Sequence, residues 1–310
     1  MVFMRKVNVA SMTITEEFAA RIKEENKKER LMKWAPLLVL VSLIIFFTIL
    51  RGSAFASVNN LIAIMNQWSI PLLVALGLTF VIMLGSIDLS IDGSVGMAGS
   101  IMSVLVLNSR NSNNFGIWGA IIAVLCSVII GFLVGLIHVK LKIPSFMVSF
   151  CFMNICVGFA YLSYSGKPAV IEDTLFKALN KTSFLGIPFI TWVALIVLAI
   201  CYYIQEYTAF GRYIYAVGTD ETIPRSVGVS VSKVKIKVFT LAGFCSGVAG
   251  VIGAIRLGQG QAAIGNGLMF PAQAAVVIGG TSLSGGKGGV LQTVVGTLIM
   301  TVLENGLTML

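Results

Sequence analysis

Long runs of residues without charge constrain the fold of this chain more than any other feature. Residues 70–84 carry no charged side chain, and neither do residues 95–108. Over all 310 residues, 57% are apolar and 11% are charged, whereas an ordinary globular domain is roughly 25% charged. So few charges cannot cover the surface of a soluble fold of this size. The sequence therefore predicts an all-α, polytopic integral membrane protein that lies in a lipid bilayer.

A membrane-spanning helix needs about 20 mostly apolar residues. The sequence offers about nine candidate spans, and several are short or interrupted by glycine, so any of these could be broken or re-entrant. The candidates cover residues 34–50, 69–84, 93–107, 117–138, 145–163, 189–205, 235–256, 268–280 and 288–307. The predicted organisation is a polar N-terminal segment, residues 1–33, followed by a transmembrane domain, residues 34–310, with a cytoplasmic loop at 206–237.

The distribution of lysine and arginine predicts the orientation. With the N-terminus in the cytoplasm, 16 of the 22 basic residues fall on the cytoplasmic side, as the positive-inside rule requires. This orientation explains the net charge of +9, so no nucleic-acid partner is expected. Residues 13–33 combine both signs of charge and are expected to form a polar helix on the cytoplasmic membrane surface.

The motifs of most enzymes are missing from this sequence. The five cysteines lie in apolar runs without metal-ligand spacing, which is typical of buried thiols, and His138 is the single histidine. The stretch SGGKGG at 284–289 lacks the hydroxyl residue that follows the lysine of a P-loop. Residues 1–30 have no apolar core of a signal peptide. We expect no metal, no cofactor and no catalytic residue here, and no ATP hydrolysis by this chain alone.

Two stretches of the chain are similar to each other. VIMLGSIDLSIDGSVGMAGSIMSVLVL (81–107) and VVIGGTSLSGGKGGVLQTVVGTLIMTVL (276–303) share an apolar start, a glycine, a Leu-Ser pair and a helix of small residues. Leu89-Ser90 aligns with Leu283-Ser284. Internal repeats are common in transporters, whose substrate pathways lie at the repeat interface. The sequence leaves the relative orientation of the two copies open.

Asp88 and Asp92 are the only charged residues between positions 69 and 108. We expect Asp88 to lie in a glycine-rich break between two spans. There it would cap the helix that begins near Gly93 by accepting its free N–H groups, and Ser90 and Ser94 could share this role. The residues expected to form the breaks in the two copies are Gly85, Asp88, Ser90, Gly93, Gly279, Gly280 and Ser284.

The cytoplasmic segment 206–237 is expected to contain a short helix parallel to the membrane. Gly218 and Thr219 precede Asp220 and Glu221, and acidic residues stabilise the first turn of a helix through its dipole. Pro224 suits an early helical position, and Gly228 suits a C-terminal cap. The pattern predicts a helix over 220–227.

Three stretches, in the same order along the chain, resemble one transporter family. GSIDLSIDGSVGMAGS is similar to its GGIDLSVGS motif, and AVGTDETIPRSVGVSVSKVK is similar to its cytoplasmic loop G-x-N-x-x-A-A-R-x-S-G-I-x-V-x-x-x-K. The C-terminal GGTSLSGGKGG and NGL are similar to its GGTSLSGG-x-G and NGL endings. The chain thus resembles, from about residue 60 to residue 310, the permease subunit of the ribose/xylose/galactoside-type ABC importers.

The resemblance implies a set of partners. Residues 218–228 would be a coupling helix in a cleft of a separate ATP-binding cassette subunit. A second permease subunit, identical or related, and an extracytoplasmic sugar-binding protein would complete an importer for a small sugar in the bacterial cytoplasmic membrane. The residues implied to contact the ATPase are Gly218, Asp220, Glu221, Arg225 and Gly228.

The sequence also departs from the family pattern. Ile223-Pro224 replaces a pair of alanines, so the short helix could start later than position 220. Ser86 replaces a glycine, and Asp92 is a one-residue insertion whose role the family does not supply. The family usually has a tenth span after NGL, so we expect that the chain ending at Leu310 is truncated.

Two interpretations of the polar residues stay open. Neutral, hydroxyl-rich sugars need a few polar groups along their pathway, and these groups could equally be contacts between helices. The candidates are Asn66, Gln67, Trp68 and Gln273. The alternative to an ATP-driven importer is a proton- or ion-coupled secondary transporter, in which the intramembrane carboxylates of Asp88, Asp92 and Glu304 would bind the coupling ion.

Overall fold

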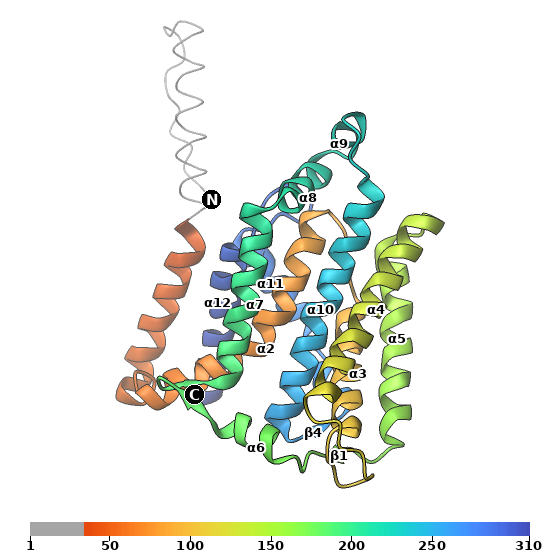
Figure 1. The fold of residues 1–310 in the computed structure, drawn as a ribbon. Helices are drawn as coiled ribbons and strands as arrows, with labels where there is room; N and C mark the ends of the chain where they lie inside the picture. Colours follow the sequence, from red (N-terminus) through yellow and green to blue (C-terminus); the bar gives the residue numbers. More distant parts are fainter. Residues whose placement is uncertain (1–33) are drawn as a thin grey trace, which may run out of the picture.

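The computed structural model describes residues 34–310, and the predicted polar helix 13–33 lies outside them. Within the described residues, nine apolar helices correspond to the nine apolar segments of the sequence (Figure 1). The all-α, polytopic prediction is therefore confirmed. These helices are Trp34–Ala54, which ends in the 3-10 turn η1 (Gly52–Ala54), α2 (Val58–Met83), α3 (Ser90–Leu105), α4 (Ile117–Leu141), α5 (Ser145–Tyr164), α7 (Phe189–Tyr207), α10 (Val231–Leu257), α11 (Met269–Gly279) and α12 (Val290–Met309).

Two of these helices are, taken alone, shorter than a membrane span; among the described residues eight segments are long and apolar enough to cross a bilayer, and one of them, residues 262–279, includes α11. With a rise of about 1.5 Å per residue, the 16 residues of α3 and the 11 residues of α11 extend about 24 and 16 Å, whereas the apolar core of a bilayer is about 30 Å thick. Irregular backbone precedes each of them. Residues 84–89 lead into α3, and the 3-10 turn η2 (Ala262–Gly265) lies shortly before α11. The predicted broken helices are thus present.

Helices α2 and α10 form the centre of the bundle. In the most apolar stretch of α10, 83% of the residues are buried, and in that of α2, 61% are buried. In the corresponding stretches of α5 and α7, about a third of the residues or fewer are buried. Helix α4 lies against α10 through glycines of both helices. A Cβ atom on Gly135 would come within 2.9 Å of the Ile236 Cα, and the contacts at Gly131 and Gly243 are closer still. Small residues allow such close backbone contact between membrane helices.

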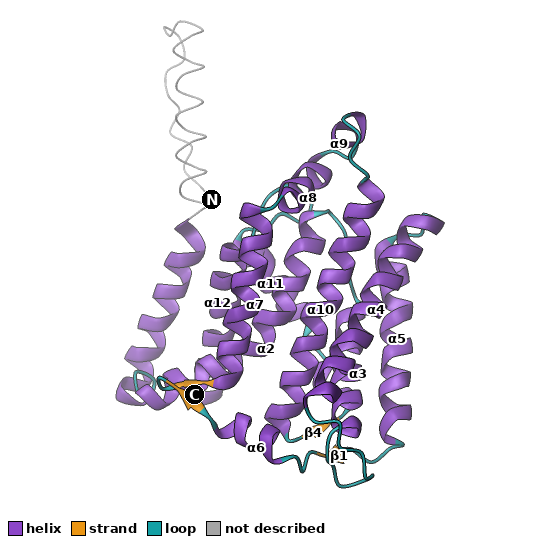
Figure 2. Cartoon of the chain, viewed as in Figure 1, coloured by secondary structure: helices purple, strands orange, loops and turns teal. Residues whose placement is uncertain are grey.

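The two ends of the bundle carry different elements (Figures 1 and 2). One end, called here the α9 end, carries α8 (Ala209–Thr219) and α9 (Thr222–Ser226). The opposite end carries α6 (Thr174–Lys181) and two small antiparallel pairs: β1 (Ala169–Val170) with β4 (Gln259–Gly260), and β2 (Ser183–Phe184) with β3 (Ile187–Pro188).

The two similar stretches run in the same direction. Helices α2 and α11 both end at the α9 end, because the loop after α11 contacts the end of α2 there: the Gly286 N–H donates to the Met83 carbonyl at 2.9 Å. The aligned Leu-Ser pairs, however, are not structurally equivalent. Ser90 is the first residue of α3, whereas Ser284 lies in the loop, six positions before α12 begins at Val290.

Candidate coupling site

The short helix expected at 220–227 is α9, which spans only Thr222–Ser226. The helix is thus shorter than the predicted range 220–227, and its start at Thr222 agrees with the later start that Ile223-Pro224 allowed. The Asp220 carboxylate accepts the backbone N–H and the hydroxyl of Thr222 at 2.8 and 2.7 Å, which holds the chain extended at Asp220 until the helix starts. The helix then stops because Gly228 turns the chain with φ +81°, a conformation that glycine adopts without strain. Gly218 lies in the preceding helix α8.

The surface of α9 combines apolar and charged side chains. Ile223 and Val227 are 61% and 75% exposed at the tip of the molecule, which Figure 1 shows as the outermost part of the α9 end. Glu221 contacts Lys235 of α10 at 2.5 Å and Arg225 at 3.7 Å. The exposed tip of α9 thus carries two apolar side chains next to a network of ion pairs.

The Asp220 carboxyl is fully exposed, yet it has a defined hydrogen-bond environment. The backbone N–H of Thr222, followed by its hydroxyl, donates to the ionised form of the carboxyl and lowers the pKa of Asp220 below its ordinary value. The residue therefore stays ionised at neutral pH and keeps the start of α9 in place.

Gly218 connects α8 to both breaks of the repeat. A Cβ atom at this position would overlap the Met83 carbonyl oxygen at the end of α2 and would lie 2.7 Å from the Gly286 nitrogen. A Cβ atom on Gly285, whose φ is +82°, would lie 2.6 Å from the Gly218 carbonyl oxygen and 2.9 Å from the Gly85 nitrogen. We call Met83, Gly85, Gly218, Gly285 and Gly286 the glycine junction. It brings together the three motifs that the sequence singled out.

Two further side chains hold the second break against the α7–α8 segment. The Tyr215 hydroxyl donates to the Gly288 carbonyl at 2.8 Å. The buried Gln205 accepts the N–H of Val290, the first residue of α12, at 2.7 Å. Sequence reasoning missed both residues, because a tyrosine and a glutamine near the end of an apolar run carry no motif that distinguishes them from ordinary interface residues.

The first break is held by α5. Ser145 and Ser149, one helical turn apart, accept the N–H groups of Ile87 and Leu89 at 3.1 and 3.0 Å. The buried Asp88 accepts the N–H and the hydroxyl of Ser90 at 2.8 and 2.6 Å. Non-helical backbone inside a membrane protein needs such partners.

The expected position of the helix start at this break needs a correction. Helix α3 begins at Ser90, three residues before Gly93, because Asp88 binds the first residue of the helix directly. Ser94 takes no part in this cap, since its hydroxyl lies 3.8 Å from the Cys156 sulfur on α5.

Asp92 caps α11, the helix that leads into the second copy of the repeat. Its carboxylate accepts the N–H of Met269 at 2.8 Å and that of Gly267 at 3.2 Å. Met269 is the first residue of α11, and Leu268, its N-cap residue, has no side-chain cap of its own. The carboxylate thus binds free N–H groups at the positive end of the α11 dipole. The start of α3 and the start of α11 therefore meet inside the bundle.

The other break residues are in close backbone contacts or turns. Gly93 faces the Met153 backbone of α5, and Gly279 faces the Gln292 backbone of α12. Gly280 ends α11 with φ +115°, and Gly85 turns the chain with φ +68°. Ser284 is exposed in the second break.

Two of the four polar candidates for a substrate pathway lie at the contact between α2 and α12. The buried Trp68 donates its indole N–H to Thr297 at 2.8 Å, and Gln67 accepts from Asn305 at 3.4 Å. These two are thus contacts between helices in this structure. Asn66 has a buried side-chain oxygen without a hydrogen-bond partner among residues 34–310, and Gln273 on α11 is half-buried.

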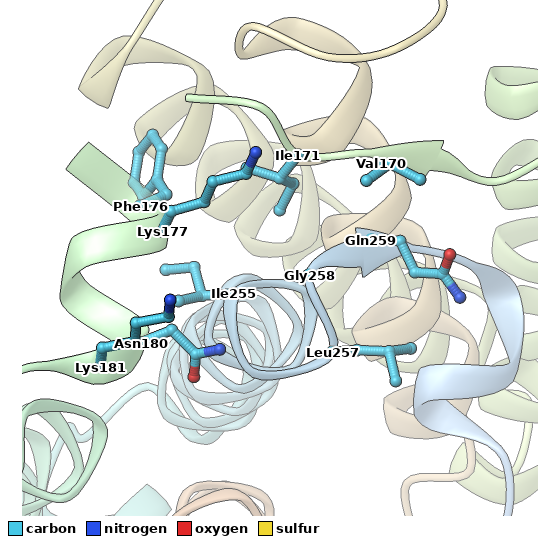
Figure 3. A pocket seen from close by; sticks show the side chains of 10 residues that line it. All are labelled: Val170, Ile171, Phe176, Lys177, Asn180, Lys181, Ile255, Leu257, Gly258 and Gln259. Carbon is cyan, nitrogen blue, oxygen red and sulfur yellow. The ribbon is translucent and has the colours of Figure 1, made fainter. Parts of the chain in front are cut away.

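The end opposite α9 has a polar groove of about 480 Å³. Figure 3 shows Lys177, Asn180 and Lys181 of α6 on one side of it and Gln259 of β4 on the other, with Ile255 of α10 between them. Two lysines and two amide side chains give this groove hydrogen-bond donors and positive charge.

Broken helices that meet inside a bundle of apolar helices, with a small exposed helix at one end, define the class of multi-pass membrane transport proteins. Residues 60–310 match the family of the branched-chain amino acid transport system permease component, and the chain belongs to this family. It is a multi-pass membrane permease.

Several curated relatives are similar to most of the chain. The ribose import permease of Haemophilus influenzae is 35% identical over 87% of this chain and 84% of its own length. The ribose import permease of Escherichia coli K12 is 34% identical over 91% of this chain and 88% of its own length. An L-arabinose ABC transporter permease of Azospirillum brasilense is 29% identical over 88% of this chain and 80% of its own length. No solved structure matches the chain.

Proposed function

We propose that this chain is the membrane-spanning permease subunit of an ATP-driven ABC importer for a small sugar. The observation that carries the proposal is the glycine junction, in which the backbone of α8 contacts the breaks after α2 and after α11. A displacement of the exposed α9 would therefore reach the helices that enclose the pathway. The names of the relatives, which import ribose or L-arabinose, support a pentose as the first substrate to test.

The α9 end is proposed to face the cytoplasm of a bacterium, with the chain in the inner membrane. Lys142, Arg225 and Lys235 line one groove at this end, and Lys233 and Lys237 line another. This concentration of basic residues fits the positive-inside rule. A separate ATP-binding cassette subunit would cover Ile223 and Val227, and it would hydrolyse the ATP because this chain has no P-loop.

The opposite end would receive substrate from a soluble sugar-binding protein. The groove of Lys177 and Lys181 offers the basic side chains that acidic residues of such a protein could pair with. A second permease subunit is proposed to complete the pathway. Asn66 and Gln273 remain candidates for contacts with sugar hydroxyl groups.

The ion-coupled alternative gives the two aspartates a different role. A coupling carboxylate has to exchange its ion with the pathway, but Asp88 and Asp92 accept backbone N–H groups at helix starts. These bonds favour a structural role for both residues and the ATP-driven mechanism for the chain.

The test is purification of the tagged full chain from native membranes in a mild detergent, with mass spectrometry of the proteins that accompany it. A P-loop ATPase in near-equal amount, and ATP-dependent uptake of labelled ribose or arabinose in proteoliposomes with the binding protein, would support the proposal. Uptake by the chain alone, driven by a proton or sodium gradient without ATP, would contradict it.

A further inference from the structure

A groove of about 480 Å³ lies at the α9 end, between α8 and α10 and beside the turn that joins α9 to α10. Phe210 and Tyr213 of α8 form one wall, and Lys233 and Lys237 of α10 form the other. The remaining lining residues are Ala209, Val227, Gly228, Val229, Ser230 and Val234. The groove is separate from the glycine junction.

The charge of this groove is not neutralised. Lys233 and Lys237 are one helical turn apart, so their side chains lie on the same face of α10. The lining contains no acidic residue, and neither lysine has an ion pair within residues 34–310. The Lys237 ammonium group lies 5.9 Å from the centre of the Phe210 ring. Two adjacent ammonium groups without a carboxylate attract a ligand of high negative charge density.

A second basic groove at the same end differs in this respect. It is lined by Lys142, Arg225 and Lys235, but also by Glu221. Glu221 forms ion pairs with Arg225 and Lys235. Of the two basic grooves, the one with Lys233 and Lys237 is therefore the better anion site.

The surroundings indicate that the anion belongs to a lipid. Helix α7 ends at Tyr207, two residues before Ala209 in the groove, and exposes Tyr203 and Tyr207 in its last turns. Tyrosines of this kind are enriched at the boundary between membrane and water. Ile200 and Ile196 are exposed about one and two turns earlier on the same helix. An apolar helix surface thus leads towards the groove from the membrane side.

We propose that the groove binds the phosphate of an anionic phospholipid in the cytoplasmic leaflet. This inference rests on the proposed orientation, with the α9 end in the cytoplasm. Lysines bind phosphate as point charges, and basic pockets between helices at the cytoplasmic surface bind anionic headgroups. Because Val227, Gly228 and Val229 line the groove, a bound lipid contacts the turn that carries α9. The lipid would restrain the segment that is proposed to contact the ATPase.

The test uses native mass spectrometry of the full chain in detergent, titrated separately with phosphatidylglycerol and with phosphatidylcholine of the same acyl chains. The variant combines Lys233→Gln and Lys237→Gln, and its matched control combines Lys140→Gln and Lys142→Gln. We expect the wild type to prefer phosphatidylglycerol, and the variant to lose about fivefold in affinity for each lysine removed. The pair of substitutions Lys233→Arg and Lys237→Arg should retain the preference, and the control should resemble the wild type.

Three results would overturn the proposal. The control pair could weaken phosphatidylglycerol binding as much as the groove variant, which would mean general charge attraction. Inorganic phosphate could displace the lipid at equal concentration, which would mean a site for a soluble anion. The groove variant could keep its lipid preference and instead lose a co-purifying ATPase subunit, which would mean that the lysines contact protein. Lipid binding is measured without nucleotide or sugar, so failure of the proposed transport function would not produce any of these results.

Discussion

The carboxylate of Asp92 accepts the N–H of Met269 at 2.8 Å across a sequence separation of 177 residues. Asp92 lies in the first turn of α3, and Met269 is the first residue of α11. One side chain therefore joins the starts of the two short helices: α3 lies in the first copy of the repeat, and α11 leads into the second. Neither helix can move along its axis by more than a hydrogen-bond length without breaking this contact.

Replacing Asp92 should destabilise the protein. Loss of a side-chain cap costs about 0.5–2 kcal/mol, so Asp92→Ala should lower the free energy of unfolding by about 1–2 kcal/mol. Asp92→Asn keeps an acceptor oxygen and should cost less. Thermal unfolding of the purified variants in detergent measures both effects. Equal stability of Asp92→Ala and the wild type would show that the contact with α11 contributes nothing.

Gly218→Ala should disrupt the glycine junction. Its Cβ would overlap the Met83 carbonyl, and overpacking of this kind costs about 1–3 kcal/mol. Substrate uptake should fall together with stability. Gly158→Ala is the matched control, because no atom lies within 4 Å of its Cβ position on α5. The prediction fails if Gly218→Ala retains wild-type stability and uptake.

Substitutions at the tip of α9 should weaken binding of the ATPase subunit without lowering the stability of the fold. Ile223→Ser and Val227→Ser remove exposed apolar side chains, so the unfolding temperature should stay within about 2 °C of the wild-type value. Binding of the ATPase subunit should weaken by about 2 kcal/mol if these residues are central to the interface. Co-purification and titration with the ATPase subunit measure this. Val58→Ser, at an exposed position at the start of α2, the end of that helix away from α9, should have no effect on binding.

Trp68→Phe distinguishes a contact between helices from a sugar site. The substitution removes the indole N–H that donates to Thr297 and should cost about 1 kcal/mol of stability. Because the ring is buried against α12, the KM for sugar uptake should not change. A large rise in KM with unchanged stability would instead assign Trp68 to the pathway.

The start of α9 should respond to pH only under acidic conditions. The pKa of Asp220 is lowered from 3.8 by the bonds from Thr222, so the folded state favours the ionised carboxyl. The stabilisation is fully present above pH 3.8 and is lost as the pH falls through the lower, folded-state pKa. Carbon NMR of labelled aspartate should give a pKa below 3.8 for Asp220. Thr222→Pro removes both the backbone N–H and the hydroxyl, so it should return the pKa towards this value.

The sequence was sufficient to predict the membrane class and the approximate position of most apolar helices, because uninterrupted hydrophobicity is a local property. The start of α2 was missed, since the helix begins at Val58 and not near residue 69. The sequence could not distinguish Asp88 from Asp92. Both precede a run of small residues, but the helix that Asp92 caps lies 177 residues further along the chain. The short span of α9 was missed for a related reason, since its start depends on the hydrogen bonds of Asp220 rather than on propensity. Gln205 became significant only through its contact with Val290.

The glycine junction consists of main-chain atoms in direct contact. A side chain between two helices can change rotamer and absorb a small shift, whereas a peptide plane has no such freedom. A movement of α8 would therefore displace the end of α2 and the loop after α11 directly. With main-chain atoms at its centre, the junction places the backbone of α8 directly against the Met83 carbonyl and the Gly286 nitrogen, so a shift of Gly218 towards them meets peptide groups rather than adjustable side chains.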